Sequence, residues 1–223
     1  MTTNPQRPKQ PGDRAPNFTL PAVNREGAVA LDDYRGKQPV LVGLFRGLHC
    51  PFCRRQLVQL AAMQEKLKRA GVETLAVVNT TLDRARLYFK YRPTPVALAA
   101  DPEASTHRLF GVPAGELGEV SGWPLRATPE EFGAVRINPT GELAAALQPM
   151  DANDELNRRD GFQLTEVDQQ IFAAHSTQLV GHFLIDRDGI IRWAHVEAGE
   201  RMADLGKLPT ETDILAAARA LPR

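Results

Sequence analysis

The hydrophobic pattern of this chain alternates between short apolar runs and longer segments with a helical period. Val40–Phe45 is a continuous apolar run, which is typical of a central strand buried on both faces. In Pro51–Ala70, apolar residues recur at three- and four-residue steps, which predicts a helix with one buried side. Arg and Lys crowd its last turn and Gly71 follows, as helix C-termini prefer.

The same alternation continues toward residue 111. Further strands are predicted over Val72–Val78 and Val96–Ala99. Helices are predicted over Leu82–Tyr91 and Glu103–Phe110, the second ended by a glycine. Because strands and helices alternate, the pattern predicts an α/β fold with a parallel central sheet flanked by helices.

The last quarter of the chain has a different pattern. The apolar runs His182–Ile185 and Ile190–Trp193 flank the sequence Asp-Arg-Asp-Gly, which predicts a hairpin with an Asp/Gly turn. Thr210 and Asp213 match a capping box, so a final helix is predicted to begin there.

Between these two parts the periodicity loosens and prolines recur. Helical pieces are predicted around Pro129–Val135 and Thr165–His175, and the charged cluster at Asp151–Asp160 is interpreted as a solvated surface. We interpret residues 112–178 as a helical insertion before the hairpin, because they lack enough apolar periodicity for a core of their own. Residues 11–223 are then one domain. Within the insertion, the Thr165–His175 helix is a candidate to cap a pocket and shape substrate choice, the alternatives being a dimer contact or a passive addition.

Composition narrows the classes of function. The chain has 27 basic and 27 acidic side chains, so nucleic acid and anionic membrane surfaces are not expected as partners. No apolar run has the length of a membrane helix or of a signal peptide, so we expect a cytoplasmic protein. Residues 1–10 are rich in proline and polar side chains, which predicts a flexible segment.

The two cysteines, Cys50 and Cys53, lie where the apolar strand ends and the helix begins. A thiolate there meets unpaired backbone N–H groups and the positive end of the helix dipole, which predicts a lowered pKa for Cys50. Arg46 adds positive charge, and Pro51 suits the first helical position. Because Cys53 lies almost one turn away, we predict that Cys50 is the exposed nucleophile and Cys53 resolves its covalent intermediate.

Two neighbours are candidate supporting residues. His49 is a candidate to tune the pKa of Cys50 or to shuttle a proton near neutral pH, the alternative being an exposed polar turn residue. Arg54 is a candidate to hold the thiolate, the alternative being a solvated side chain. Zinc would need two histidine ligands besides the cysteines, and no histidines are paired at a metal-binding spacing, so neither a metal nor an organic cofactor is predicted.

The first 110 residues resemble the alkyl hydroperoxide reductase/thiol-specific antioxidant group, the peroxiredoxin-like branch of the thioredoxin fold. The matching segments are Pro11–Phe18, Leu31–Lys37 and the apolar strand that leads to Cys50. Farther along the chain, the C-terminal hairpin Phe183–Arg192 looks like the family's last two strands. The resemblance implies that Cys50 attacks a hydroperoxide, becomes a sulfenic acid and then forms a disulfide. It also implies electrons from thioredoxin or a small thiol, and often a homodimer.

The chain departs from the family pattern around this site. Gly43 and Gly47 stand where a typical member has Pro and Thr or Ser, so the hydroxyl that would orient the peroxide is absent. Val180 occupies the expected position of the family's second arginine, for which Arg46 and Arg192 are candidate substitutes.

A thioredoxin-like thiol-disulfide oxidoreductase is the alternative function. The close cysteine pair favours it, but the segment 176–181 has no proline to serve as the cis-proline that thioredoxins place opposite their C-x-x-C. A non-catalytic redox-sensing module, with a reversible Cys50–Cys53 disulfide that alters partner binding, is a second alternative.

Overall fold

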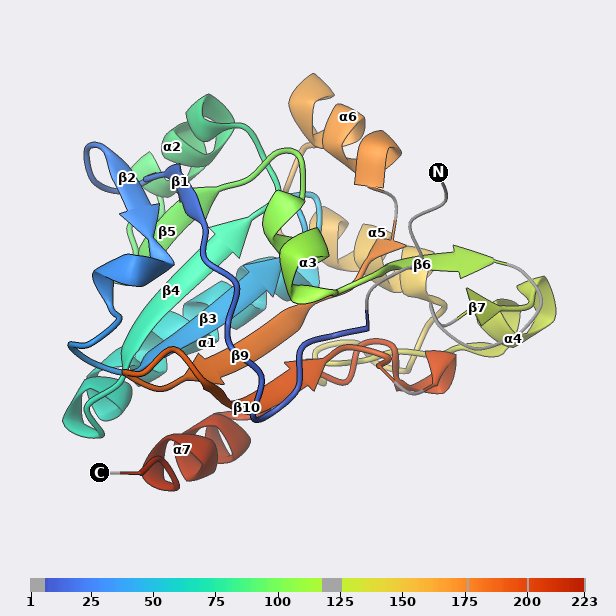
Figure 1. Ribbon diagram of the computed structural model, residues 1–223. Helices are drawn as coiled ribbons and strands as arrows, with labels where there is room; N and C mark the ends of the chain where they lie inside the picture. The colour runs from blue at the N-terminus through green and yellow to red at the C-terminus, as the bar shows by residue number, and fades with distance from the viewer. Residues whose placement is uncertain (1–6, 118–125, 176, 200, 223) are drawn as a thin grey trace, which may run out of the picture.

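A five-stranded mixed sheet forms the centre of the computed structural model, which describes residues 7–117, 126–175, 177–199 and 201–222 (Figure 1). The strand order is β10-β9-β3-β4-β5. Strands β3, β4 and β5 are parallel, as predicted, whereas β9 pairs antiparallel with β3, and β10 with β9. The five strands are β3 (Val40–Phe45), β4 (Glu73–Val78), β5 (Ala97–Ala100), β9 (Gly181–Ile185) and β10 (Ile191–Val196).

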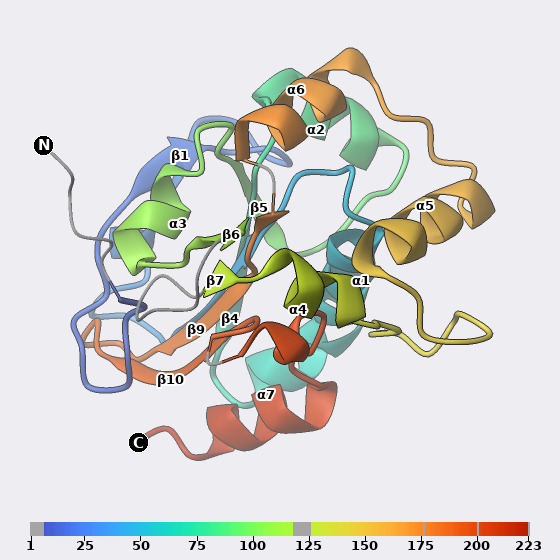
Figure 2. The same ribbon diagram turned by 90° about the vertical axis from the view of Figure 1, so that its right-hand side faces the viewer.

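Helices cover both faces of this sheet. In both ribbon views α3 lies on one face and α1 on the other, and α7 packs against α1 (Figures 1 and 2). The predicted helices are confirmed within a few residues at their ends, and Thr210 forms the predicted capping box with Asp213. Their bounds are α1 (Pro51–Arg69), α2 (Leu82–Lys90), α3 (Ser105–Phe110) and α7 (Glu211–Arg219).

The apolar pattern explains why β3 and α1 form the centre of the molecule. All six residues of β3 are buried between its neighbours β4 and β9. Helix α1 buries Leu57, Leu60 and Leu67 against the sheet, which removes apolar surface from water. Its C-terminus is followed by Gly71 in the left-handed region (φ 76°), where glycine is favoured.

Short elements surround the sheet. An antiparallel pair of strands contacts β5, and two 3-10 turns follow β2 and β10. Of the predicted flexible segment 1–10, residues 1–6 lie outside the described residues, and the Lys9 amide donates a hydrogen bond to the Phe110 carbonyl. These elements are β1 (Thr19–Pro21), β2 (Ala28–Ala30), η1 (Leu31–Asp33) and η2 (Met202–Asp204).

In its described residues the insertion contains three helices and three short strands, so it is not purely helical. Helices were predicted at α4 and α6, but α5 was missed. The cluster interpreted as a solvated surface lies on α5, whose Ala152, Leu156 and Asn157 are buried against the rest of the protein. The insertion elements are β6 (Ala114–Leu117), β7 (Arg126–Ala127), α4 (Pro129–Ala134), α5 (Pro149–Arg159), α6 (Glu166–His175) and β8 (Thr177–Gln178).

The insertion shares one hydrophobic core with the sheet. Val135, Ile137 and Leu156 belong to the same cluster of buried side chains as the residues of β3. Within the described ranges, no helix combines the length and the apolar character that a membrane crossing requires.

Candidate active site

Cys50 is the N-terminal capping residue of α1, directly after the loop that leaves β3. Its backbone is extended (φ −85°, ψ 108°), and its Sγ accepts a hydrogen bond from the Cys53 amide at 3.2 Å. Pro51 takes the first helical position, where its missing N–H is not needed. The predicted strand-to-helix placement of the cysteine pair is therefore confirmed.

The prediction of an exposed nucleophile is wrong. Cys50 and Cys53 are each only 2% exposed, because the insertion and the segment after β10 cover this end of α1. Both thiols are free. Cys50 meets a small pocket of about 60 Å³, so a small reactant has a defined place beside its sulfur.

The pocket is predominantly apolar. Most of its wall comes from the insertion, through α4, α5 and α6. Of these three helices, only α6 was a candidate from the sequence to cap a pocket. The lining residues are Arg46, His49, Cys50, Phe52, Phe132, Ile137, Pro149, Met150, Asn153, Phe172 and Leu205.

The two cysteines have opposite pKa shifts. Burial raises the pKa of Cys50, but the hydrogen bond with the Cys53 thiol, the positive charge of Arg46 and the Cys53 amide outweigh it and lower the pKa to about 6. Burial and the neighbouring Cys50 raise the pKa of Cys53 well above its ordinary value. Cys50 is thus the thiolate of the pair at neutral pH, as predicted from its place at the helix N-terminus.

Arg46 is the cation at this site. Its guanidinium forms a two-pronged ion pair with Glu197, donates to the Gln178 carbonyl at 3.1 Å and also interacts with the Cys50 side chain. Burial alone would lower the pKa of Arg46, but Glu197 and the two cysteines raise it. Of the two candidate substitutes for the family's arginine, Arg46 is therefore the one beside Cys50.

The sequence model of the AhpC/TSA family matches residues 11–132, more than half of the chain. This chain belongs to the AhpC/TSA family. It is 30% identical over 112 residues to the chloroplastic peroxiredoxin Q of Oryza sativa subsp. japonica, which covers 50% of each protein. It is also 30% identical over 105 residues to peroxiredoxin Bcp of Escherichia coli (strain K12), covering 47% of this chain and 66% of that protein. The chain thus spans about half the length of the peroxiredoxin Q that it matches.

Solved structures share the fold over nearly the whole chain. The reduced 2-Cys peroxiredoxin of Plasmodium vivax matches with a TM-score of 0.59 and 18% identity, covering 96% of this chain and 82% of that chain. Peroxidoxin BcpB of Mycobacterium tuberculosis matches with a TM-score of 0.56 and 13% identity, covering 96% and 99%. The peroxiredoxin-like, thioredoxin-type fold predicted from the sequence is therefore confirmed.

The packing explains why this AhpC/TSA member has glycine at two positions of the family pattern. A Cβ added to Gly47 would lie 2.7 Å from the Asn79 carbonyl oxygen and 2.8 Å from the His49 ring. A Cβ on Gly43 would lie 2.6 Å from the Phe45 ring. A residue with a hydroxyl side chain does not fit at position 47 without moving the loop before Cys50.

Neither Val180 nor Arg192 places a positive charge beside Cys50. The Val180 side chain is fully buried, while its amide donates to Glu197 at 3.2 Å. Arg192 pairs with Asp186 at 2.6 Å, in the hairpin turn at the other end of β9. Of the two candidate substitutes, Arg192 therefore does not replace the family's second arginine beside the thiol, whereas Arg46 lies there.

His49 is not a neutral-pH switch. Burial and the positive charge of Arg46 lower its pKa to about 4, so its ring is neutral near pH 7. The ring is buried and packs edge-to-face on Phe172 of α6, with centroids 5.3 Å apart. This geometry gives His49 a place in the pocket wall, and proton shuttling near neutral pH is not expected.

Both sequence hypotheses for Arg54 are wrong, because its side chain is neither solvated nor directed at the thiolate. Its guanidinium donates to the Leu48 carbonyl at 2.7 Å, to Asn157 at 2.9 Å and to Asp160 at 2.6 Å. It also lies 4.0 Å above the Phe162 ring. Arg54 therefore fastens the insertion to the loop that carries Cys50.

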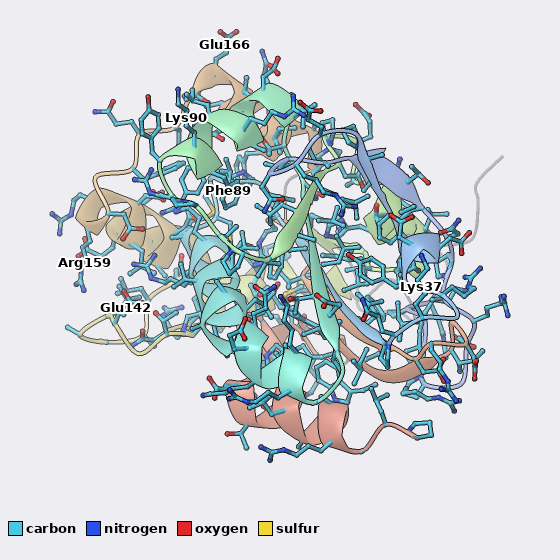
Figure 3. The ribbon with its side chains drawn as sticks, turned by 90° about the vertical axis from the view of Figure 1, so that its left-hand side faces the viewer. Lys37, Phe89, Lys90, Glu142, Arg159 and Glu166 are labelled. Atoms are coloured by element: carbon cyan, nitrogen blue, oxygen red, sulfur yellow. The ribbon has the colours of Figure 1, made fainter. Side chains whose placement is uncertain are left out.

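A second layer of contacts extends this connection. The Asn157 amide donates to the His49 carbonyl at 3.1 Å, and Arg55 pairs with both Glu142 and Asp160. Glu142 and Arg159 lie together on the side of the molecule that α5 forms (Figure 3), where Arg159 donates to the Glu142 carbonyl at 2.8 Å. Within the described ranges, no cluster of three or more His, Cys, Asp or Glu side chains is placed to hold a metal ion.

Proposed function

We propose that this chain is a thiol peroxidase that reduces hydroperoxides with Cys50. The Cys50 thiolate attacks the outer peroxide oxygen and the O–O bond breaks, so that the sulfur becomes a sulfenic acid and an alcohol or water leaves after taking a proton. The Cys53 thiol then displaces the hydroxyl of the sulfenic acid, releasing water and forming a Cys50–Cys53 disulfide. A dithiol such as thioredoxin, or two small thiols, returns both cysteines to the reduced state.

The observation that carries this proposal is the environment of the Cys50 sulfur. Its pKa of about 6 makes it mostly thiolate at neutral pH, and Arg46 lies beside it in the wall of the pocket. The thiolate is the nucleophilic form of cysteine, and a fixed cation stabilises charge that develops on the peroxide oxygen.

The pocket supports a preference among hydroperoxides. Phe52, Phe132, Met150 and Phe172 surround the approach to Cys50, so an apolar substituent on the peroxide loses contact with water when it binds. We therefore propose that organic hydroperoxides with a small apolar group are better substrates than hydrogen peroxide. The cytoplasmic location and the homodimer stay predictions from the sequence.

Thiol-disulfide exchange is the second candidate function, and one observation favours it. The Cys50 and Cys53 thiols hydrogen-bond to each other, so a Cys50 mixed disulfide would have its resolving thiol in place. This reaction would use the same disulfide, but a substrate disulfide in place of a peroxide.

One turnover assay separates the two functions. Purified protein with thioredoxin and its reductase is given an organic hydroperoxide, hydrogen peroxide or a small-molecule disulfide, and reductant consumption is followed. The proposal expects the highest kcat/KM with the organic hydroperoxide and no turnover in Cys50→Ser. Fast turnover with the disulfide alone would support the second function and contradict the peroxidase. No turnover with any substrate would contradict both and leave the redox-sensing alternative.

A further inference from the structure

Glu197 is a buried carboxylate at the end of β10, and no sequence pattern marks it. Its side chain is only 1% exposed. Oε1 accepts from Arg46 Nη2 at 3.0 Å and from the Gly206 amide at 2.9 Å. Oε2 accepts from Arg46 Nη1 and from the Val180 amide at 3.2 Å. One carboxylate thus joins three separate segments of the chain behind Cys50.

We propose that Glu197 is a positioning residue that holds the Arg46 guanidinium against the Cys50 sulfur. The arginine side chain is long and flexible, and a paired carboxylate fixes the plane of its guanidinium through two parallel hydrogen bonds. Gln178 holds Arg46 Nη1 from another side, through its carbonyl. Arg46 is therefore held by Glu197, directly after β10, and by the Gln178 carbonyl of β8.

The backbone after Glu197 supports this role. Ala198 is buried and has a φ of 49°, in the left-handed region that non-glycine residues rarely adopt. Such a conformation is unfavourable for a residue with a Cβ and persists only where the surroundings enforce it. The tight turn directs Glu197 inward, toward the amides of Val180 and Gly206.

The position of Val180 connects this arrangement to the family pattern. Val180 stands where the family's second arginine is expected, and here its amide donates to Glu197. The chain instead supplies the guanidinium from the end of β3, and Glu197 is the group that fixes it there.

Glu197 has two opposite effects on the pKa of Cys50, one through its own negative charge and one through the position of Arg46. The groups whose charges act on Cys50 are Arg46, which lowers its pKa, and Glu197, which raises it, besides Cys53. His49, the other titratable group beside it, has a pKa of about 4 and is neutral near pH 7. If Glu197 acted only as a negative charge, its removal would lower the pKa of Cys50. If it positions Arg46, its removal raises that pKa.

Glu197→Gln tests this difference. Each carboxylate oxygen accepts two N–H groups, so an amide NH₂ in either orientation faces two donors, and at most one of the two hydrogen bonds to the guanidinium remains. The measurement is the ultraviolet absorbance of the thiolate against pH in a Cys53→Ser background, where Cys50 is the one remaining cysteine. We expect the midpoint to rise by about one pH unit, because a nearby opposite charge shifts a pKa by about 1–3 units. An unchanged or lower midpoint would overturn the proposal.

A second background controls for general disturbance of the site. With Arg46→Met present, Glu197→Gln is expected to lower the midpoint, because only the charge effect remains. An equal rise with and without Arg46 would overturn the proposal. If Glu197→Gln does not fold, Glu197→Asp provides the same readout, because it keeps the charge but withdraws it by one methylene. A rise in its midpoint supports positioning, and an unchanged or lower midpoint rejects it.

Glu211→Gln, which removes an exposed partner of Lys66, is the matched control and should leave the midpoint unchanged. The inference rests on Cys50 being the reactive thiol of the proposed function. The absorbance is measured without any peroxide, so failure of the peroxidase and failure of this inference give different results.

Discussion

At the scale of single residues, the chemistry depends on how each polar group is placed in a buried site. The burial that raises the pKa of Cys50 is outweighed by the hydrogen bond with the Cys53 thiol, by Arg46 and by the Cys53 amide at the start of α1. The sequence was enough to predict this thiolate, because Cys50 and the helix start are neighbours in the chain. It was not enough to find Glu197, which lies 151 residues from Arg46 and reaches it only through the folded hairpin.

Gly47 provides a prediction at this scale. Gly47→Ser restores the hydroxyl of the family pattern, but its Cβ would meet the Asn79 carbonyl at 2.7 Å. We expect the free energy of unfolding to fall by about 1–3 kcal/mol, the usual cost of overpacking. Chemical denaturation measures it, and Gly133→Ser, whose Cβ meets nothing within 4 Å, is the control with an expected change below about 0.5 kcal/mol. Equal stability of the two variants would contradict the steric account.

His182 predicts a dependence of stability on pH. It is fully buried, and burial followed by the nearby His195 lowers its pKa to about 3. Unfolding returns this pKa to its ordinary value near 6.5, so between the two values the unfolded chain binds a proton that the native state excludes. The free energy of unfolding is therefore unaffected by His182 above about pH 6.5. As the pH falls below that value, protonation of His182 in the unfolded chain lowers the free energy of unfolding, by about 2 kcal/mol at pH 5.

The measurement is chemical denaturation of the wild type and of His182→Leu at pH 7 and pH 5. The loss of stability on acidification should be smaller in His182→Leu by about 2 kcal/mol. An equal loss in both proteins would show that His182 takes up its proton equally in the folded and unfolded states.

At the scale of elements, α1 and α5 work as a pair. Helix α1 carries the cysteines, and Arg54 from its second turn reaches Asn157 and Asp160 at the end of α5. The strands and helices from β3 to α3 were predictable because apolar runs mark the strands and helical periodicity or a closing glycine marks the helices, whereas β2 was not predicted. Helix α5 was missed because its sequence is rich in charges, and only the folded protein shows that Arg54 is the partner of Asp160.

Arg54→Met tests this pairing. It removes a buried guanidinium with three hydrogen bonds and leaves Asn157 and Asp160 without that partner. We expect a loss of about 2 kcal/mol in the free energy of unfolding, less than for a fully buried ion pair because Asp160 is partly exposed. Arg158→Met, from an exposed pair on α5 itself, should leave the free energy of unfolding essentially unchanged. Similar losses in both variants would argue against the connection.

At the scale of the whole molecule, the insertion completes the active site. It shares the core of the sheet and supplies most of the wall of the pocket over Cys50. The sequence predicted where the additional residues lie and suggested that they cap a pocket. The side chains that form the pocket wall could not be predicted, because they meet through contacts between distant segments. Local periodicity in the sequence carries no information about such contacts.

Phe172 is the residue with which the predicted preference for organic hydroperoxides can be tested. It lines the pocket from α6, and Phe172→Ala should remove apolar contact with a bound organic hydroperoxide. We expect the ratio of kcat/KM for the organic hydroperoxide over hydrogen peroxide to fall about 5-fold, the equivalent of about 1 kcal/mol of apolar contact. Leu164→Ala, a similarly exposed apolar residue outside the pocket lining, is the control. The same ratio in both variants would reject a role for the insertion in selectivity.

The most direct test of the account is the single-turnover rate at which Cys50 reacts with an organic hydroperoxide. It is measured by rapid quenching and mass spectrometry of the sulfenic acid in Cys53→Ser, across a range of pH. We predict a rate far above that of free cysteine at the same thiolate fraction, rising through a midpoint below the ordinary cysteine pKa to a plateau, because Arg46 and the helix start still act on Cys50 in this variant. A rate no faster than free cysteine at equal thiolate fraction would contradict the proposal that this site is built to reduce hydroperoxides.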